Sequence, residues 1–203
     1  TDDWNTLDIM GHEFTHGVVQ DEAGLVYQDE SGALNESFAD IFGEMSESWG
    51  EGINDWLVGA DRGAIRSFSN PNAYNDPDTY NGTNWYVGTG DNGGVHTNSG
   101  VQNHWFYLLS NGGSGTNDNG TAYSVSGITR FVARDIAYRG LVFYLSGSDG
   151  YIDARAASLQ AAYDLYGGCS NEIIQVGNAW RAVGVESQSA QYNNSACGNY
   201  PAT

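Results

Sequence analysis

The chain has 203 residues, and 25 acidic side chains against seven basic ones give it a formal net charge of −18. Such a surface repels nucleic acid and anionic lipid, so we expect neither as a partner. No apolar run is long enough to cross a bilayer. The sequence contains no internal repeat and no clear linker, so residues 1–203 are treated as one unit.

The first predicted element is a helix over residues 5–20, which carries the pattern His-Glu-x-x-His. Residues four apart share one face of a helix, so His12 and His16 can direct their imidazole nitrogens at one metal ion. Glu13 is placed to act on a water at that metal rather than to bind the metal itself. The alternative is a solvated helix face that carries two histidines by chance.

A second helix is predicted from about Ala33 to Trp49, because apolar residues recur there at helical spacing. Glu36 lies beside that apolar stripe, where a carboxylate is costly to bury unless it meets a cation. Glu36 is therefore the candidate third ligand, and three protein ligands plus water is the pattern of catalytic zinc. Asp40, one turn later, can accept the remaining N–H of a ligating histidine.

Residues 50–95 are rich in Gly, Asn, Asp and Pro, which indicates long functional or ion-binding loops. Helical periodicity returns at about 99–111, 126–145, 153–166 and 171–183, with a glycine-rich gap at 112–120. The predicted fold is therefore mainly α-helical, with few short strands.

The loop region carries an acid–histidine pair, Asp91 and His96, at a predicted loop-to-helix junction. Such a pair can donate a hydrogen bond to a developing oxyanion. A helix-capping cluster with an incidental histidine explains the same residues equally well.

Two further groups of residues leave alternatives open. Asp8, Glu44, Glu47 and Asp55 would repel one another unless a hard cation such as calcium joined them, although a solvated acidic face is also possible. Cys169 and Cys197 lack a Cys-x-x-Cys spacing and a neighbouring histidine, which argues against metal and redox chemistry. We favour a disulfide between them over two free thiols, and a disulfide implies an oxidising compartment.

These motifs together resemble the C-terminal catalytic part of the thermolysin family of secreted zinc metalloproteases. The matching residues are His12, Glu13, His16, Asn35, Glu36 and Asp40, at the family's own separation. The resemblance extends from Asp8 to about Val185. It implies one zinc ion on His12, His16 and Glu36, with Glu13 as general base and Asp40 orienting His12.

The same resemblance implies roles for residues that their sequence context leaves unassigned. His96 and Tyr27 would stabilise the oxyanion, with Asp91 orienting His96, and Arg66 would hold a substrate carbonyl. Pseudolysin-like members have a similar late disulfide and one calcium site. The implied calcium ligands are Asp8, Glu44, Glu47, Asp55 and the carbonyl of Leu57, and the implied wall of the main specificity pocket is Ile9, Val58 and Ile65.

The function implied is a secreted endopeptidase that uses a metal-activated water and prefers a bulky hydrophobic residue after the scissile bond. A zinc aminopeptidase of the same wider clan is one rival, although such enzymes place one residue fewer between His16 and Glu36. A non-catalytic zinc-folded module is another, but it has little reason to keep Glu13. Family members also place a β-rich domain before the active-site helix, so we expect this chain to be a fragment whose partners are peptide substrates and an upstream domain or propeptide.

Overall fold

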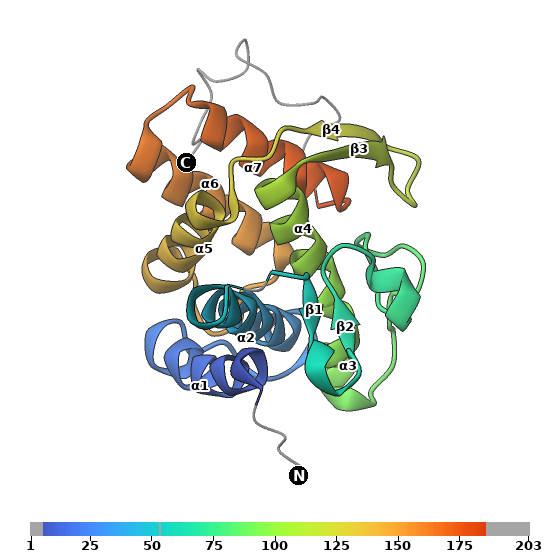
Figure 1. Ribbon diagram of the computed structural model, residues 1–203. Helices are drawn as coiled ribbons and strands as arrows, with labels where there is room; N and C mark the ends of the chain where they lie inside the picture. The colour runs from blue at the N-terminus through green and yellow to red at the C-terminus, as the bar shows by residue number, and fades with distance from the viewer. Residues whose placement is uncertain (1–5, 53, 186–203) are drawn as a thin grey trace.

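The computed structural model describes residues 6–52 and 54–185, and helices dominate this part of the chain (Figure 1). The described residues also form two antiparallel two-stranded sheets. The helices are α1 (Leu7–Glu22), α2 (Asp29–Gly50), α3 (Asp91–Asn98), α4 (Gly100–Asn111), α5 (Arg130–Tyr144), α6 (Tyr151–Tyr166) and α7 (Asn171–Ala182), and the strands are β1 (Leu57–Val58), β2 (Arg66–Ser67), β3 (Gly113–Thr116) and β4 (Ala122–Val125).

The prediction of a mainly helical fold is confirmed, with differences at element boundaries. Helix α2 begins at Asp29, four residues before the predicted start at Ala33. Its first turn contains polar and small residues, so apolar periodicity gives no signal there. Residues 112–120, predicted as a glycine-rich gap, contain strand β3 and the turn of the β3–β4 hairpin instead. β3 is Gly-Ser-Gly-Thr and has no apolar residue, and β4 is only four residues long, so neither gave a strand signal in the sequence.

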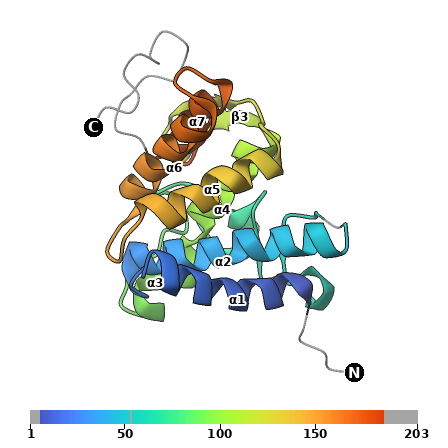
Figure 2. The same ribbon diagram turned by 90° about the vertical axis from the view of Figure 1, so that its left-hand side faces the viewer.

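Helices α1 and α2 pack backbone to backbone and form one edge of the molecule (Figure 2). A Cβ atom at Gly43 would lie 2.4 Å from the carbonyl oxygen of Asp8, and one at Gly11 would lie 2.8 Å from Ser46 Oγ. Only glycine allows so close an approach at these two positions. The short interhelical distance brings His12 on α1 near Glu36 on α2.

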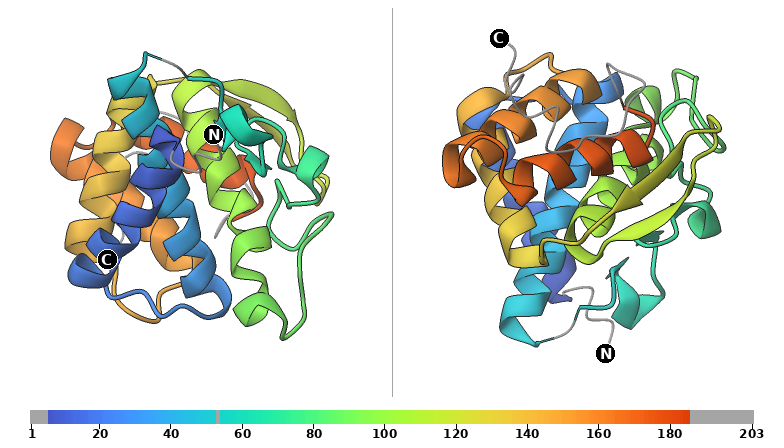
Figure 3. Two further views of the ribbon diagram at one scale, coloured as in Figure 1. Left: turned by 60° about the horizontal axis from the view of Figure 1, so that its bottom comes forward. Right: turned by 90° about the horizontal axis from the view of Figure 1, so that it is seen from above.

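The hydrophobic core lies between α2 and the later helices, with α4 passing through the middle of the molecule (Figure 3). Phe38 and Ile41 of α2 are buried there, and Trp105 of α4 stacks on Trp180 of α7 with ring centroids 4.7 Å apart. The core therefore fixes α2, and α2 in turn fixes α1 through the glycine contacts.

The outer face of α1 is not covered by any described residue. Phe14 is 77% exposed and Trp49, at the end of α2, is 85% exposed. They border an apolar groove of about 530 Å³ whose other walls include Val18, Phe42 and Tyr138. Within the described residues, no helix combines the length and apolar character needed to cross a membrane.

Candidate active site and metal centre

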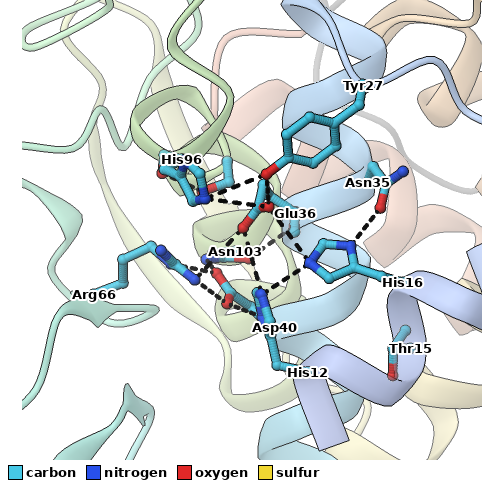
Figure 4. A network of polar contacts seen from close by, with 12 residues as sticks. His12, Thr15, His16, Tyr27, Asn35, Glu36, Asp40, Arg66, His96 and Asn103 are labelled. Carbon is cyan, nitrogen blue, oxygen red and sulfur yellow. Dashed lines mark hydrogen bonds and ion pairs between the residues drawn. The ribbon is translucent and has the colours of Figure 1, made fainter. Parts of the chain in front are cut away.

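Three predicted zinc ligands meet between α1 and α2 (Figure 4). The Nε2 atoms of His12 and His16 are 3.1 Å apart, and each lies 3.5 Å from an oxygen of Glu36. Ligand atoms about 2.1 Å from a tetrahedral zinc lie about 3.4 Å from one another. Glu36 is 1% exposed, and its Oε2 accepts no hydrogen bond from a described residue. The donor set and its spacing therefore fit a zinc ion.

Asp40 contacts the His12 ring on the side that faces away from the other two candidate ligands. Its Oδ1 lies 2.8 Å from Nδ1 of His12, so Nε2 of that ring faces the triad. Burial alone would lower the pKa of His12, but the contact with Asp40 outweighs it and the pKa is raised. Such a contact would orient the ring and strengthen it as a metal ligand, and the orienting role of Asp40 stays a prediction that this distance supports.

Arg66 and Asn103 complete the environment of Asp40, and neither contact was anticipated from the sequence. Arg66 Nε and Nη2 donate to the two carboxylate oxygens at 2.7 and 2.6 Å, and Asn103 donates to Oδ2 at 2.8 Å. Burial would raise the pKa of Asp40, yet Arg66 and His12 hold it well below its usual range. Arg66 Nη2 also lies 3.7 Å from Glu36, at the floor of the site. Its predicted grip on a substrate carbonyl stays a prediction.

The second histidine has its own support. Nδ1 of His16 lies 2.7 Å from Oδ1 of Asn35, and the amide group of Asn35 donates to the Leu25 carbonyl at 3.2 Å. Asn35 is one residue before the third ligand on α2. Both candidate ligand rings are thus contacted by side chains of α2, His12 by Asp40 and His16 by Asn35.

Tyr27, His96 and Asp91 gather on the open side of the triad. The Tyr27 hydroxyl donates to Glu36 Oε1 and lies 3.3 Å from His96 Nε2, which is itself 3.4 Å from Glu36. Nδ1 of His96 is 2.6 Å from Asp91 Oδ1, so Nε2 is the nitrogen that faces the site. Burial, and then the bond to Glu36, raise the pKa of Tyr27, so its hydroxyl keeps its proton and can donate.

Glu13 is exposed at the mouth of a cleft of about 380 Å³. The same cleft is lined by the three candidate ligands, Tyr27 and His96. A carboxylate that faces solvent beside a metal site is free to take a proton from water, which a ligand could not do. A further acid, Asp76, lies buried near Arg66, and burial raises its pKa to about 7 against the opposing effect of Arg66.

The predicted wall of the specificity pocket comes together at the β1–β2 hairpin. Val58 pairs with Arg66 across the hairpin. A Cβ atom at Gly59 would lie 3.8 Å from Ile9 Cδ1 and 3.9 Å from Ile65 Cγ1. Ile9 and Ile65 therefore both lie close to Gly59, and their part in a specificity pocket stays a prediction.

The carboxylates of Glu44, Glu47 and Asp55 converge as a second group that could hold a metal ion. Burial raises the pKa of Glu44 to about 8 and that of Glu47 to about 7, and neighbouring acids add to both effects. One oxygen of each glutamate accepts no hydrogen bond from a described residue. Buried, repelling carboxylates with free oxygens suit a hard cation such as calcium.

Asp8 and Leu57 lie at the margin of this group. The charge of Asp8 contributes to the raised pKa of both glutamates, but its own oxygens also accept from the N–H groups of Ile9 and Gly59. The Leu57 N–H donates to Asp55 at 2.9 Å. Cys197, the predicted partner of Cys169, lies outside the described residues, so that disulfide stays a prediction.

Comparison with known proteins agrees with this geometry. Residues 23–185 match the family model described as the thermolysin metallopeptidase, alpha-helical domain. The fold and the triad define a helical metallopeptidase domain. The chain belongs to the thermolysin family.

Several relatives are similar over most of this chain. Bacillolysin of Bacillus caldolyticus is 47% identical over 186 residues, which cover 88% of this chain and 33% of the relative. The extracellular elastase of Staphylococcus epidermidis is 40% identical, with coverage of 88% and 32%. The solved precursor of protealysin, a metalloproteinase from Serratia proteamaculans, superposes with a TM-score of 0.73 at 28% identity and covers 88% of this chain and 57% of that one. The chain thus spans about a third of the first two relatives.

Proposed function

We propose that the chain is the helical part of the catalytic unit of a secreted zinc endopeptidase. One observation carries the proposal: Glu13, Tyr27 and His96, none of them a zinc ligand, line the same cleft as the triad. A module that used zinc only for folding would not need a free base and two hydrogen-bond donors there. Relatives named neutral protease and extracellular elastase support both the activity and the secretion.

Zinc, when bound, supplies a Lewis acid that polarises the scissile carbonyl and lowers the pKa of a water molecule. Glu13 takes a proton from the attacking water and later gives it to the leaving amine. His96 and Tyr27 donate hydrogen bonds to the oxyanion that develops on the carbonyl oxygen. Asp91 keeps Nδ1 of His96 occupied, so that Nε2 stays directed at the cleft.

The apolar side chains of Ile9, Val58 and Ile65 near the β1–β2 hairpin are the proposed wall of a pocket for a bulky apolar residue after the scissile bond, and Arg66 would hold the carbonyl of that residue. We further propose one structural calcium on Glu44, Glu47 and Asp55, with Asp8 and the Leu57 carbonyl adding to the site. Peptides and proteins are the proposed substrates.

The first test compares the unsubstituted chain with Glu13→Gln on a blocked peptide and on a free-amine peptide. We expect one zinc per chain in both proteins, cleavage of the blocked peptide by the unsubstituted chain, and loss of most of that activity in the variant. A free amine as a requirement for cleavage would favour the aminopeptidase alternative. Near-normal turnover by Glu13→Gln would refute the role of Glu13.

An upstream domain, or a propeptide, is the proposed partner of the apolar groove on α1. The groove exposes Phe14 and Trp49 next to the active-site helix, and the curated relatives are longer than this chain. We expect the chain alone to bind zinc and a hydrophobic dye but to hydrolyse casein far more slowly than a fusion to the upstream part of bacillolysin. A chain that is dye-silent and as active alone as in the fusion contradicts this.

A further inference from the structure

The loop before α3 is wound tightly around the side chain of Tyr86. Cβ atoms placed on Gly88, Gly90 and Gly94 would lie 2.4, 2.7 and 2.5 Å from atoms of this side chain. Real side chains do not approach so closely, so each of the three positions must be glycine while the ring is in place. The backbone of one short segment thus contacts the same tyrosine three times.

The segment that closes this loop has an unusual backbone. Asp91, Asn92, Gly93 and Gly94 have φ angles of 50, 50, 90 and 81°, four successive residues in the left-handed region. Asp and Asn enter the left-handed region more readily than other non-glycine residues, whose cost there is about 1–2 kcal/mol. A run of four such residues still costs conformational freedom, and contacts with neighbouring structure favour it.

Tyr86 is itself held by Asn98, which is buried. The Tyr86 N–H donates to Asn98 Oδ1 at 2.9 Å, and Asn98 Nδ2 donates back to the Tyr86 carbonyl at 3.1 Å. The Gly90 N–H donates to the Tyr86 hydroxyl at 3.1 Å. The carbonyl of Asn98 accepts a hydrogen bond from the Tyr151 hydroxyl in the core at 2.6 Å. Asn98 therefore connects Tyr86, at the start of the loop, to the core of the molecule.

This loop carries Asp91 and His96, the pair that faces the candidate zinc ligands. Asp91 bonds to His96 twice, through the His96 N–H at 3.0 Å and through Nδ1 at 2.6 Å. Tyr86 does not line the zinc cleft. We infer that Tyr86, clamped by Asn98, is a positioning residue: it holds Asp91 in its strained conformation and so directs His96 at the oxyanion. This inference rests on the proposed function.

The first test is a double-mutant cycle in the zinc-loaded protein, with kcat on a blocked peptide. Tyr86→Leu should lower kcat by about tenfold with little change in KM, because misplacement by about 1 Å can cost about 100-fold. Tyr86→Phe, which keeps the ring, should recover most of that loss. In a His96→Ala background, Tyr86→Leu should have almost no further effect, because its target is already gone. Equal losses in both backgrounds would overturn the inference.

The second test does not depend on activity. Hydrogen exchange should show faster exchange at the Gly90 and His96 amides in Tyr86→Leu, by about tenfold, with α2 amides and zinc content unchanged. Tyr163→Leu is the matched control, since Tyr163 is similarly exposed and packs on Gly168, but lies on α6. Unchanged exchange at both amides, or acceleration in α2 as well, would overturn the positioning role. If the unsubstituted protein cleaves no peptide, the proposed function is wrong. The hydrogen-exchange experiment still tests whether Tyr86 holds the segment that carries Asp91 and His96.

Discussion

Asp40 is the residue on which the buried polar contacts of the site converge: Arg66 and Asn103 donate hydrogen bonds to it, and the His12 ring lies within ion-pair distance. Asp40→Ala would remove the bidentate partner of the buried guanidinium and leave it only the more distant Glu36, and breaking a buried ion pair costs about 3–5 kcal/mol. We therefore expect a fall of that size in the free energy of unfolding, measured by denaturant titration. Zinc affinity should fall by about 10–100-fold, because the support for His12 is lost.

The matched control is Asp164→Ala, which removes an exposed partner of Arg139. Exposed ion pairs contribute little to stability. If both variants lose the same free energy of unfolding, the buried contacts of Asp40 contribute no more to stability than an exposed ion pair does.

The zinc triad could be predicted because it rests on local rules. Spacing of four residues aligns His12 with His16 on any helix, and a carboxylate beside an apolar stripe needs a cation. The bond from Arg66 to Asp40 could not be predicted in this way, because it depends on how the short β1–β2 hairpin is placed against α2. The contact of Asn103 with Asp40 was not predicted for the same reason, since the sequence around Asn103 indicates only a buried helix.

At the scale of elements, the spacing between α1 and α2 depends on Gly43. Gly43→Ala would force the Cβ atom against the Asp8 carbonyl, so the two helices must separate. We expect a loss of about 1–3 kcal/mol in stability, the usual cost of overpacking. Because His12 and Glu36 lie on opposite sides of this contact, zinc affinity should fall as well. Thermal unfolding with and without zinc measures both effects.

Gly17→Ala provides the comparison within α1. No described atom lies within 4 Å of a Cβ atom at Gly17. Alanine is favoured over glycine inside a helix by about 1 kcal/mol, so this variant should be slightly more stable than the parent. Equal destabilisation by both substitutions would mean that interhelical spacing is not what Gly43 controls.

Helix existence was predictable for α4 to α7 because each has long apolar periodicity. Helix α3 could be predicted only as a loop-to-helix junction. Its four left-handed residues follow no periodic pattern, and the segment packs against Tyr86 and against Asp29 of α2, two side chains outside the helix. The β3–β4 hairpin was hidden for a different reason, since its strands bury little apolar surface.

For the whole molecule, the carboxylate cluster predicts how stability depends on pH. The raised pKa values of Glu44 and Glu47 favour the protonated, folded state, so in chelator their contribution is fully present below about pH 4.5 and is lost as the pH rises through about 7 and 8. Bound calcium should remove this loss, and at 100 times its Kd it adds about 2.7 kcal/mol if only the folded state binds it. Unfolding measured from pH 5 to 9, with calcium or chelator, gives both curves.

The double variant Glu47→Gln, Asp55→Asn serves as the control for the calcium curves. It should keep its fold in chelator, show a flatter pH dependence and gain little from calcium. A calcium-induced shift equal to that of the parent would place the ion elsewhere in the molecule.

The close packing of α1 on α2 also bears on the order of folding. His12, Glu13, His16 and Glu36 lie within one helical hairpin, whereas His96 joins Tyr27 across 69 positions of sequence. Local contacts form early and distant ones must first overcome loop-closure entropy. Tyr27 lies in the loop of the same hairpin, so we expect the growing chain to be able to bind its metal before His96 arrives. If the proposed function holds, a partly folded chain with its metal ligands in place but His96 still distant would turn over slowly, and its own unfolded segments would be spared until the last long loop has closed.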